Sequence, residues 1–246
     1  MKKTETFLSK VVLYECKQTL ILMIENKKFF ELFIAIGLIG TVIGCQPGSS
    51  GNKKLPVLGS REIVEKEVNG KTVIDTVYHT IPEFAFVDQD SSWVTEETLE
   101  DKIYVADFFF TTCPTICPLM KNQMMRIYDK YEENPEVVLL SHSIDPVYDS
   151  VRVLKDFASR LGVKTDKWHF VTGKKEDIYT IGEKSYMVTA QEDENEPGGF
   201  VHSGAFILVD KDRHIRGFYD GTVREDVDRL MQDMDLLLAE YQSNQE

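Results

Sequence analysis

A nearly unbroken apolar run at Ile103–Thr111 constrains the fold more than any other segment of this chain. A strand with one solvated face alternates apolar and polar residues, whereas a continuous apolar run is typical of a strand covered on both faces. Such a strand belongs inside a central sheet that helices cover on both sides. The chain has 246 residues, enough for one domain of this kind with extensions.

The hydrophobic period changes directly after this run. Apolar residues recur at intervals of three and four through Met120–Tyr131, which predicts a helix that starts near Cys113. A second buried strand is predicted at Val137–Ile144. The next helix is expected to begin with Asp145 as its N-cap and to stop at Gly162.

The remaining segments alternate in the same way. Asn69-Gly70 stands between two β-branched runs and predicts a hairpin ahead of the main domain. A dithiol that follows the first core strand at a helix start is the thioredoxin arrangement. We therefore predict an α/β fold for residues 61–246, a thioredoxin-like mixed central sheet flanked by helices, with an N-terminal β-hairpin extension. Further elements are expected as a short hairpin at 84–94, strands at 168–172, 205–209 and 215–219, and helices at 175–185 and 223–241.

The first 44 residues are typical of a targeting segment. Lys27 and Lys28 precede an apolar run at 29–44, and Cys45 follows it directly, as in a bacterial lipobox where the cysteine is acylated. A plain membrane helix is the alternative, and either would place the domain outside the cytoplasm. Because residues 1–22 make an unusually long leader, we expect translation to begin at Met23. Residues 45–60 are rich in Gly, Ser and Pro and are predicted to form a flexible tether from the lipid anchor.

The charge balance excludes one class of function. Lys and Arg number 28 and Asp and Glu number 41, which gives a formal net charge of −13. Nucleic-acid binders present basic faces to phosphate, so we expect no nucleic-acid partner.

The chemistry is expected at Cys113 and Cys117. Their spacing can bring both sulfurs to one side of a helical turn, and a helix N-terminus favours the thiolate. Pro114 suits an early helical position because it has no N–H to leave unpaired. Two such thiolates can form a disulfide, bind a soft metal or attack a substrate. The alternative is that both are merely small core residues.

His202 is the candidate third ligand. It precedes a predicted buried strand, and in a thioredoxin-like sheet the loop before that strand lies beside the dithiol helix. Two thiolates and an imidazole form a ligand set that suits copper. The other four histidines are more simply explained by structural roles: His79, His142, His169 and His214.

Four stretches together resemble the Sco/SenC family, copper-binding thioredoxin-fold proteins that help assemble the binuclear copper site of cytochrome c oxidase. The likeness covers about residues 80–240. It departs from the family pattern at Val201, often acidic there, and after Asp149, where Asp-Thr-Pro is common. The stretches are Phe-Phe-Thr-Thr-Cys-Pro-Thr-Ile-Cys-Pro-Leu-Met, Ser-Ile-Asp-Pro with Asp149 downstream, Phe-Val-Thr-Gly, and Val-His-Ser-Gly-Ala-Phe-Ile-Leu-Val-Asp.

The resemblance implies that Cys113, Cys117 and His202 bind copper, as Cu(I) or Cu(II), with Asp145 and Asp149 in support. It also implies delivery of copper, or of electrons from the dithiol, to the copper-accepting subunit of a haem-copper oxidase. A thiol reductase would be a second partner. A lipid on Cys45 would anchor the domain to the cell membrane, facing the periplasmic or extracytoplasmic side.

Three other hypotheses about the function remain open at this point. The first is a metal-independent thiol–disulfide oxidoreductase, although these enzymes normally have two residues between their cysteines rather than three. The second is a peroxiredoxin-like peroxidase, although Phe110 stands where those enzymes usually have threonine. The third is a binding module that uses the hairpins at 61–94, with Cys113–Cys117 as a structural disulfide.

Overall fold

The predicted doubly covered strand is the central strand of the fold. In the computed structural model, which describes residues 54–193 and 195–243, this strand is β5 (Ile103–Phe109), and all of its residues are buried. It pairs in parallel with β6 and antiparallel with β10. The sheet has seven strands in the order β11-β10-β5-β6-β7-β3-β4. The other six are β3 (Ala85–Asp88), β4 (Trp93–Thr95), β6 (Val137–Ser143), β7 (Trp168–Thr172), β10 (Ala205–Val209) and β11 (Ile215–Asp220).

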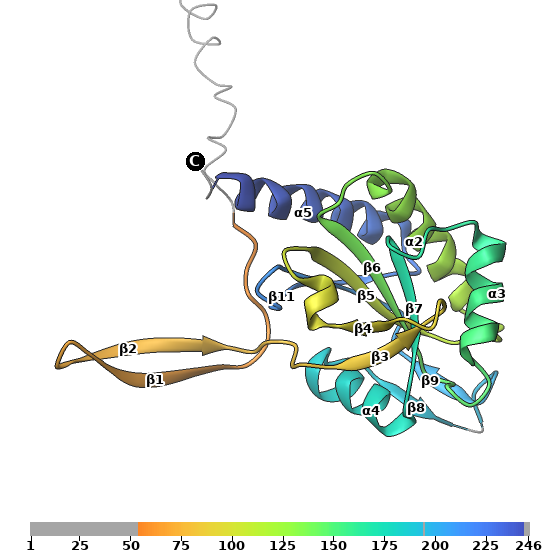
Figure 1. The fold of residues 1–246 in the computed structure, drawn as a ribbon, viewed down its shortest axis with the longest axis horizontal. Helices are drawn as coiled ribbons and strands as arrows, with labels where there is room; N and C mark the ends of the chain where they lie inside the picture. Colours follow the sequence, from red (N-terminus) through yellow and green to blue (C-terminus); the bar gives the residue numbers. More distant parts are fainter. Residues whose placement is uncertain (1–53, 194, 244–246) are drawn as a thin grey trace, which may run out of the picture. The chain divides into compact units, whose positions relative to one another are not determined.

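Helices cover both faces of this sheet (Figure 1). Residues Ile103, Val105 and Phe109 of β5 join a core with α2 (Cys117–Tyr131), α3 (Val151–Leu161) and α5 (Arg224–Ser243). The intervening residues of β5 join a second core with α4 (Lys175–Thr180) and a π-helical turn, η2 (Ile181–Ser185). A short 3-10 helix, η1 (Glu96–Leu99), follows β4. The mixed thioredoxin-like sheet is therefore confirmed, and the buried residues of both cores fall between Ile81 and Leu238.

The predicted N-terminal hairpin is also present, as a separate two-stranded sheet of β1 (Arg61–Val68) and β2 (Lys71–Tyr78). Its two-residue turn has positive φ at both central positions, 53° at Asn69 and 73° at Gly70. That pair of angles is the type I′ turn, for which Asn-Gly is the preferred sequence.

Two helix starts differ from the prediction. α2 begins at Cys117 rather than near Cys113, so the proline in its first turn is Pro118 and not Pro114. α3 begins at Val151 with Ser150 as N-cap, while Asp145 stands in a separate turn in which Asp149 N donates to Asp145 O at 2.8 Å. The residues ahead of each helix therefore form tight turns at the ends of β5 and β6.

A short hairpin that was not among the predicted elements lies between η2 and β10. It pairs β8 (Ala190–Glu192) with β9 (Phe200–His202), and Ala190 lies opposite His202. Residue His202 is therefore part of a strand and not of the loop that leads into β10.

The predicted targeting segment, residues 1–44, with Cys45 and most of the tether, lies outside the described residues. Among the helices of the described part, none combines the length and the hydropathy that crossing a membrane requires.

Candidate metal centre

Cys113 lies in the turn that follows β5. Its backbone N donates to Phe110 O at 3.2 Å, and its Sγ lies 3.6 Å from Thr115 Oγ1. The thiol is free and buried. The turn therefore fixes the first sulfur at the end of the central strand, where the chain leaves the sheet.

Cys117 is the first residue of α2, and its free thiol is partly buried. No side chain caps this helix end, and Ile116 at the N-cap cannot accept a hydrogen bond through its side chain. A helix start carries partial positive charge and unpaired N–H groups, which favour a nearby negative charge. The helix start therefore favours a negative charge on the dithiol.

His202 ends β9, on the small hairpin rather than on the central sheet. Ser203 N donates to Thr189 O at 2.9 Å, which fastens the strand just beyond the histidine. The ring packs edge-on against Phe110, with centroids 5.8 Å apart. Its Nδ1 lies 3.3 Å from its acceptor, Ser203 O. These contacts orient the ring so that Nε2 is the nitrogen that faces the cysteines.

A glycine allows the hairpin to approach so closely. Gly198 has φ of +92°, and a Cβ there would lie 2.9 Å from the Phe110 ring. Phe110 in turn packs against Phe200 with centroids 5.0 Å apart. Without a side chain at position 198, the β8–β9 loop can close over the aromatic ring that supports His202.

The three predicted ligands converge. His202 Nε2 lies 3.3 Å from Cys117 Sγ and 3.8 Å from Cys113 Sγ, and all three atoms lie within 4.8 Å of one another. Ligand atoms bonded to one metal ion at about 2.0–2.3 Å are spaced roughly 3–4 Å apart. The arrangement can therefore hold a soft metal ion with little movement.

The pKa values of the two cysteine thiols are shifted in opposite directions. A hydrogen bond from Cys117, with another from His202, lowers the pKa of Cys113 to about 3 despite its burial. The pKa of Cys117 is raised, first because its thiol donates to Cys113 and second because it is buried. The two thiols are therefore coupled, with the pKa lowered at Cys113 and raised at Cys117.

Two buried carboxyl groups stand behind the site. Burial raises the pKa of Asp107 to about 6, opposed by a hydrogen bond from Ser141. Asp107 shares with Cys117 a small cavity of about 20 Å³. Asp149 is fully buried and accepts from Thr111 N at 3.0 Å and from Ser143 Oγ at 2.6 Å. Burial raises its pKa as well.

Asp149 therefore ties the turn after β6 to the residues just before Cys113, which gives it a role in positioning the first sulfur. Asp145 makes no such contact. Its side chain accepts from Tyr148 N at 3.3 Å, within its own turn.

The other four histidines have no place at this site. His79 Nε2 lies 2.8 Å from Ser185 O, and His169 Nδ1 lies 3.0 Å from Asp88 Oδ2. His142 is fully buried among aromatic rings, stacked on Phe108 at 4.8 Å. Neither of its ring nitrogens has a hydrogen-bond partner among the described residues.

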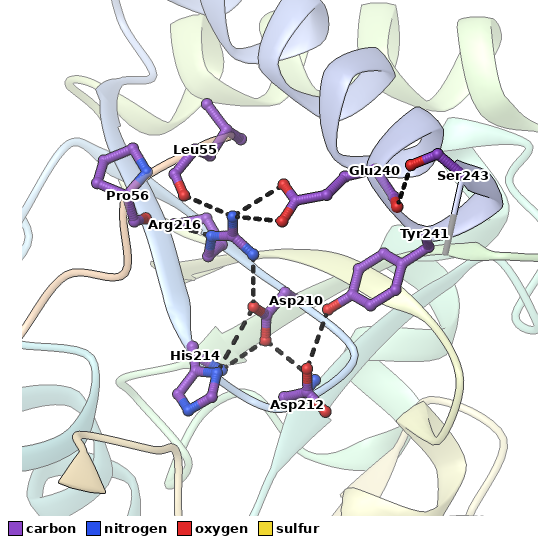
Figure 2. Close-up of polar contacts among 9 residues, drawn as sticks. All are labelled: Leu55, Pro56, Asp210, Asp212, His214, Arg216, Glu240, Tyr241 and Ser243. Atoms are coloured by element: carbon purple, nitrogen blue, oxygen red, sulfur yellow. Dashed lines mark hydrogen bonds and ion pairs between the residues drawn. The ribbon is translucent and has the colours of Figure 1, made fainter. Parts of the chain in front are cut away.

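His214 belongs to a second group of candidate ligands, with Asp210 and Asp212, in the turn between β10 and β11. Figure 2 shows that this group is tied to its surroundings. Asp210 accepts from Arg216 at 2.9 Å and from His214 N at 2.8 Å, and Asp212 accepts from Tyr241 Oη at 3.3 Å. The carboxylates of this group already accept hydrogen bonds from other residues of the protein.

Two supports of the site were not predicted from the sequence. The β8–β9 hairpin was missed because its strands are only three residues long and one of them is acidic. Asp149 was predicted only to support the ligands, and its contacts with Thr111 and Ser143 were not predicted. The missed signal was the pair of hydroxyl residues, Thr111 and Ser143, at the ends of adjacent strands.

Comparisons with known proteins agree on one family. The model of the SCO1/SenC family matches residues 74–239. The chain is 32% identical over 167 residues to the "SCO1 protein homolog" of Bacillus subtilis (strain 168), covering 67% of this chain and 86% of that protein.

Three solved structures are similar over about two thirds of the chain. A SCO1/SenC family lipoprotein from Bacillus anthracis str. Ames is 30% identical with a TM-score of 0.60, covering 65% of this chain and 95% of that one. BsSco, described as a member of the Sco family of cytochrome c oxidase assembly proteins with a disulfide switch, is 32% identical with a TM-score of 0.58, covering 65% and 93%. Arabidopsis thaliana ScoI with copper bound is 27% identical with a TM-score of 0.54, covering 64% and 98%.

Proposed function

The chain belongs to the SCO1/SenC family, and on that premise we propose that it binds one copper ion through Cys113, Cys117 and His202. Its task is to supply copper, or reducing equivalents, for the binuclear copper site of cytochrome c oxidase. The convergence of the three side chains from two separate elements is the observation that carries this proposal.

The donor set favours copper on chemical grounds. Thiolates are soft ligands that select Cu(I), and imidazole suits both copper oxidation states. The thiolate on Cys113 is available at neutral pH, because hydrogen bonds already hold its pKa low. The copper-bound Arabidopsis thaliana structure and the oxidase-assembly description of BsSco support the same assignment for this chain.

The dithiol gives the site a second use. Oxidation of Cys113 and Cys117 to a disulfide releases two electrons and two protons, which can reduce a disulfide of the copper-accepting oxidase subunit to two thiols. A thiol reductase must then reduce the Cys113–Cys117 disulfide before copper can bind again. The disulfide switch described for BsSco supports this cycle.

Copper titration of the reduced protein tests the proposal. A fragment of residues 53–246 retains every described residue and both cores. We expect one copper ion per chain, with thiolate-to-copper absorption that Cys113→Ala removes. His214→Ala is the matched control, since it removes an imidazole from the second group of candidate ligands. Copper retention unchanged in both Cys117→Ala and His202→Ala would refute the proposed ligand set.

A metal-independent thiol–disulfide oxidoreductase is the second candidate, and two free thiols at a helix start, with the pKa of Cys113 lowered, favour it. A thiolate beside a protonated thiol is the arrangement that thiol–disulfide exchange uses. The two functions separate in an insulin-reduction assay with copper chelated. Rapid turnover together with weak copper binding would support the oxidoreductase, whereas slow turnover with tight binding supports the chaperone.

We also propose that Cys45 is acylated and holds the domain on the extracytoplasmic face of the cell membrane. The lipobox-like sequence carries this proposal, and the Bacillus anthracis relative is itself described as a lipoprotein. Anchoring would raise the local concentration of the domain near a membrane-bound oxidase. Cys45→Ser should abolish incorporation of labelled fatty acid and release the protein from the membrane fraction, and unchanged labelling would disprove it.

A further inference from the structure

The hairpin of β1 and β2 leaves large apolar side chains in solvent. Ile63 is 74% exposed and Ile74 is 71% exposed, on the same face of the ribbon. The hairpin forms its own sheet, which Figure 1 shows as a two-stranded ribbon. An isolated two-stranded hairpin is only marginally stable in water and gains from added strands. The family match begins at residue 74, so β1 lies outside the matched residues.

The turn determines which backbone groups remain free. In a hairpin with a two-residue turn, the flanking pair Val68 and Lys71 is hydrogen-bonded, and such pairs alternate along the ladder. The odd-numbered residues of β1 therefore direct their N–H and C=O groups away from β2. Among the described residues, nothing pairs with this outer edge. On the outer edge of β2, by contrast, Thr76 N already donates to Asp75 Oδ1 at 2.9 Å.

The charges of β1 are complementary to themselves. If two copies of the strand pair antiparallel with Val64 opposite its own equivalent, Arg61 lies opposite the second copy's Glu67, and Glu62 lies opposite its Lys66. Each contact occurs twice because of the twofold symmetry. Lys66 then lies between that glutamate and its own partner, Asp75, at 2.6 Å. Opposite charges across a strand pair stabilise it, whereas like charges destabilise it.

The alternative registers are poorer. Centring the pair on Glu65 would place two glutamates face to face, and centring it on Ile63 would shorten the ladder at the Arg61 end. Centring it on Val64 also places outward-facing residues opposite one another, as a hydrogen-bonded antiparallel ladder requires. One register therefore satisfies the backbone, the charges and the ladder length together.

We propose that β1 is a self-association edge, which pairs with β1 of a second copy of this chain to form a four-stranded sheet centred on Val64. This interaction is independent of the copper proposal, since none of its residues belongs to the metal centre. It makes the protein a dimer joined through a segment that the family match does not include.

Sedimentation equilibrium of the 53–246 fragment tests the pairing. We expect a reversible dimer at concentrations up to about 1 mM, the range that tethering to a shared surface provides. Arg61→Glu and Glu67→Arg should each weaken the dimer roughly tenfold, because two ion pairs become like-charge pairs. The double variant restores both pairs and should recover wild-type association. Lys71→Glu, on the same hairpin but outside the pairing, is the control.

Disulfide trapping tests the register separately. In a background with Cys113→Ser and Cys117→Ser, Val64→Cys should form an intermolecular disulfide under mild oxidation, because a residue on the twofold axis faces itself. Val68→Cys, on the same face, should not. A wild-type fragment that stays monomeric, single variants that associate like wild type, or trapping at position 68 rather than 64 would each overturn the proposal.

Discussion

Within residues 54–193 and 195–243, two groups of three side chains place their ligand atoms within 4.8 Å of one another, yet the two groups differ in the hydrogen bonds that those atoms already make. At Cys113, Cys117 and His202 the closest neighbours of the ligand atoms are mainly one another. At the second group, the Asp210 carboxylate accepts from backbone N–H groups and from Arg216, and the Asp212 carboxylate accepts from Tyr241 Oη (Figure 2). Proximity alone does not distinguish a metal centre from a structural turn. The two are distinguished by whether the lone pairs of the ligand atoms already accept hydrogen bonds from the protein.

The largest expected effect separates the two groups directly. Cys113→Ala or Cys117→Ala should weaken copper binding at least about a thousandfold, because changes around a ligand alone cost 10–100-fold. Asp212→Ala and His214→Ala should leave the affinity unchanged. Competition with a chelator of known affinity measures both. A comparable loss of affinity in the turn variants would show that the two groups are not different in kind.

The second prediction concerns stability at the turn. Arg216 is 6% exposed and contacts Asp210, Glu240 and the backbone O of Leu55. Arg216→Ala should lower the free energy of unfolding by about 3–5 kcal/mol, because it leaves the buried carboxylate of Asp210 and the partly buried carboxylate of Glu240 without their cationic partner. Urea denaturation measures the loss.

A matched arginine provides the control for that prediction. Arg229 forms ion pairs with Asp226 and Asp233, but half of its side chain is exposed. Arg229→Ala should cost less than about 1 kcal/mol. Equal losses in the two variants would contradict a structural role for the buried turn, and copper affinity should be unaffected by either substitution.

The third prediction concerns His142. Its ring nitrogens have no hydrogen-bond partner among the described residues, and it belongs to neither group of candidate ligands. Burial lowers the pKa of His142 to about 3, below its usual 6.5. Between these values the unfolded state binds more protons, so stability falls as the pH decreases from 6.5 towards 3, by up to about 1.4 kcal/mol per pH unit. His142→Phe should remove this part of the acid sensitivity.

Unfolding curves of wild type and His142→Phe at several pH values measure that difference. Phenylalanine suits the aromatic surroundings of this position, formed by Phe86, Phe108 and Tyr186. A pH dependence identical to that of wild type would mean that His142 is not the group responsible.

The smallest predicted effect lies within the metal centre itself. The hydrogen bond from Cys117 is the largest cause of the low pKa of Cys113. Cys117→Ala should therefore raise that pKa by more than about one unit, which is a tenfold change in proton affinity. His202→Ala should raise it less. Thiolate ultraviolet absorbance against pH measures both, and a larger effect from His202→Ala would reverse the assigned order.

Much of the fold follows from hydrophobic period alone. The continuous run at β5 and the three-and-four spacing of α2 each predicted an element and the side it buries, because burial on one or two faces leaves a direct trace in the residue order. The first residues of the helices were predicted less accurately. Pro114 and Asp145 both suit a first turn, but each stands in a tight turn that holds the end of a strand instead.

The ligands of the candidate site were found from residue types, but the supports of the site were not. Cys113 and Cys117 lie close together in the sequence, and His202 was singled out by its place before a predicted buried strand. Nothing in the residue order showed that Gly198 lets the small hairpin close over Phe110, or that Asp149 reaches back to Thr111. Such contacts depend on where distant backbones meet, and a single sequence does not record that distance.

If copper is passed on as proposed, the placement of His202 on β9, apart from the turn after β5 and the start of α2 that hold the two sulfurs, has a consequence for its release. Ligands that are held by separate parts of the chain can leave a metal ion one after another. If the small hairpin swings outward, the imidazole leaves first, and the ion stays held by two sulfurs with an open face for an incoming thiol. The hand-over can then proceed by stepwise exchange of donors, so that the ion is never free in solution.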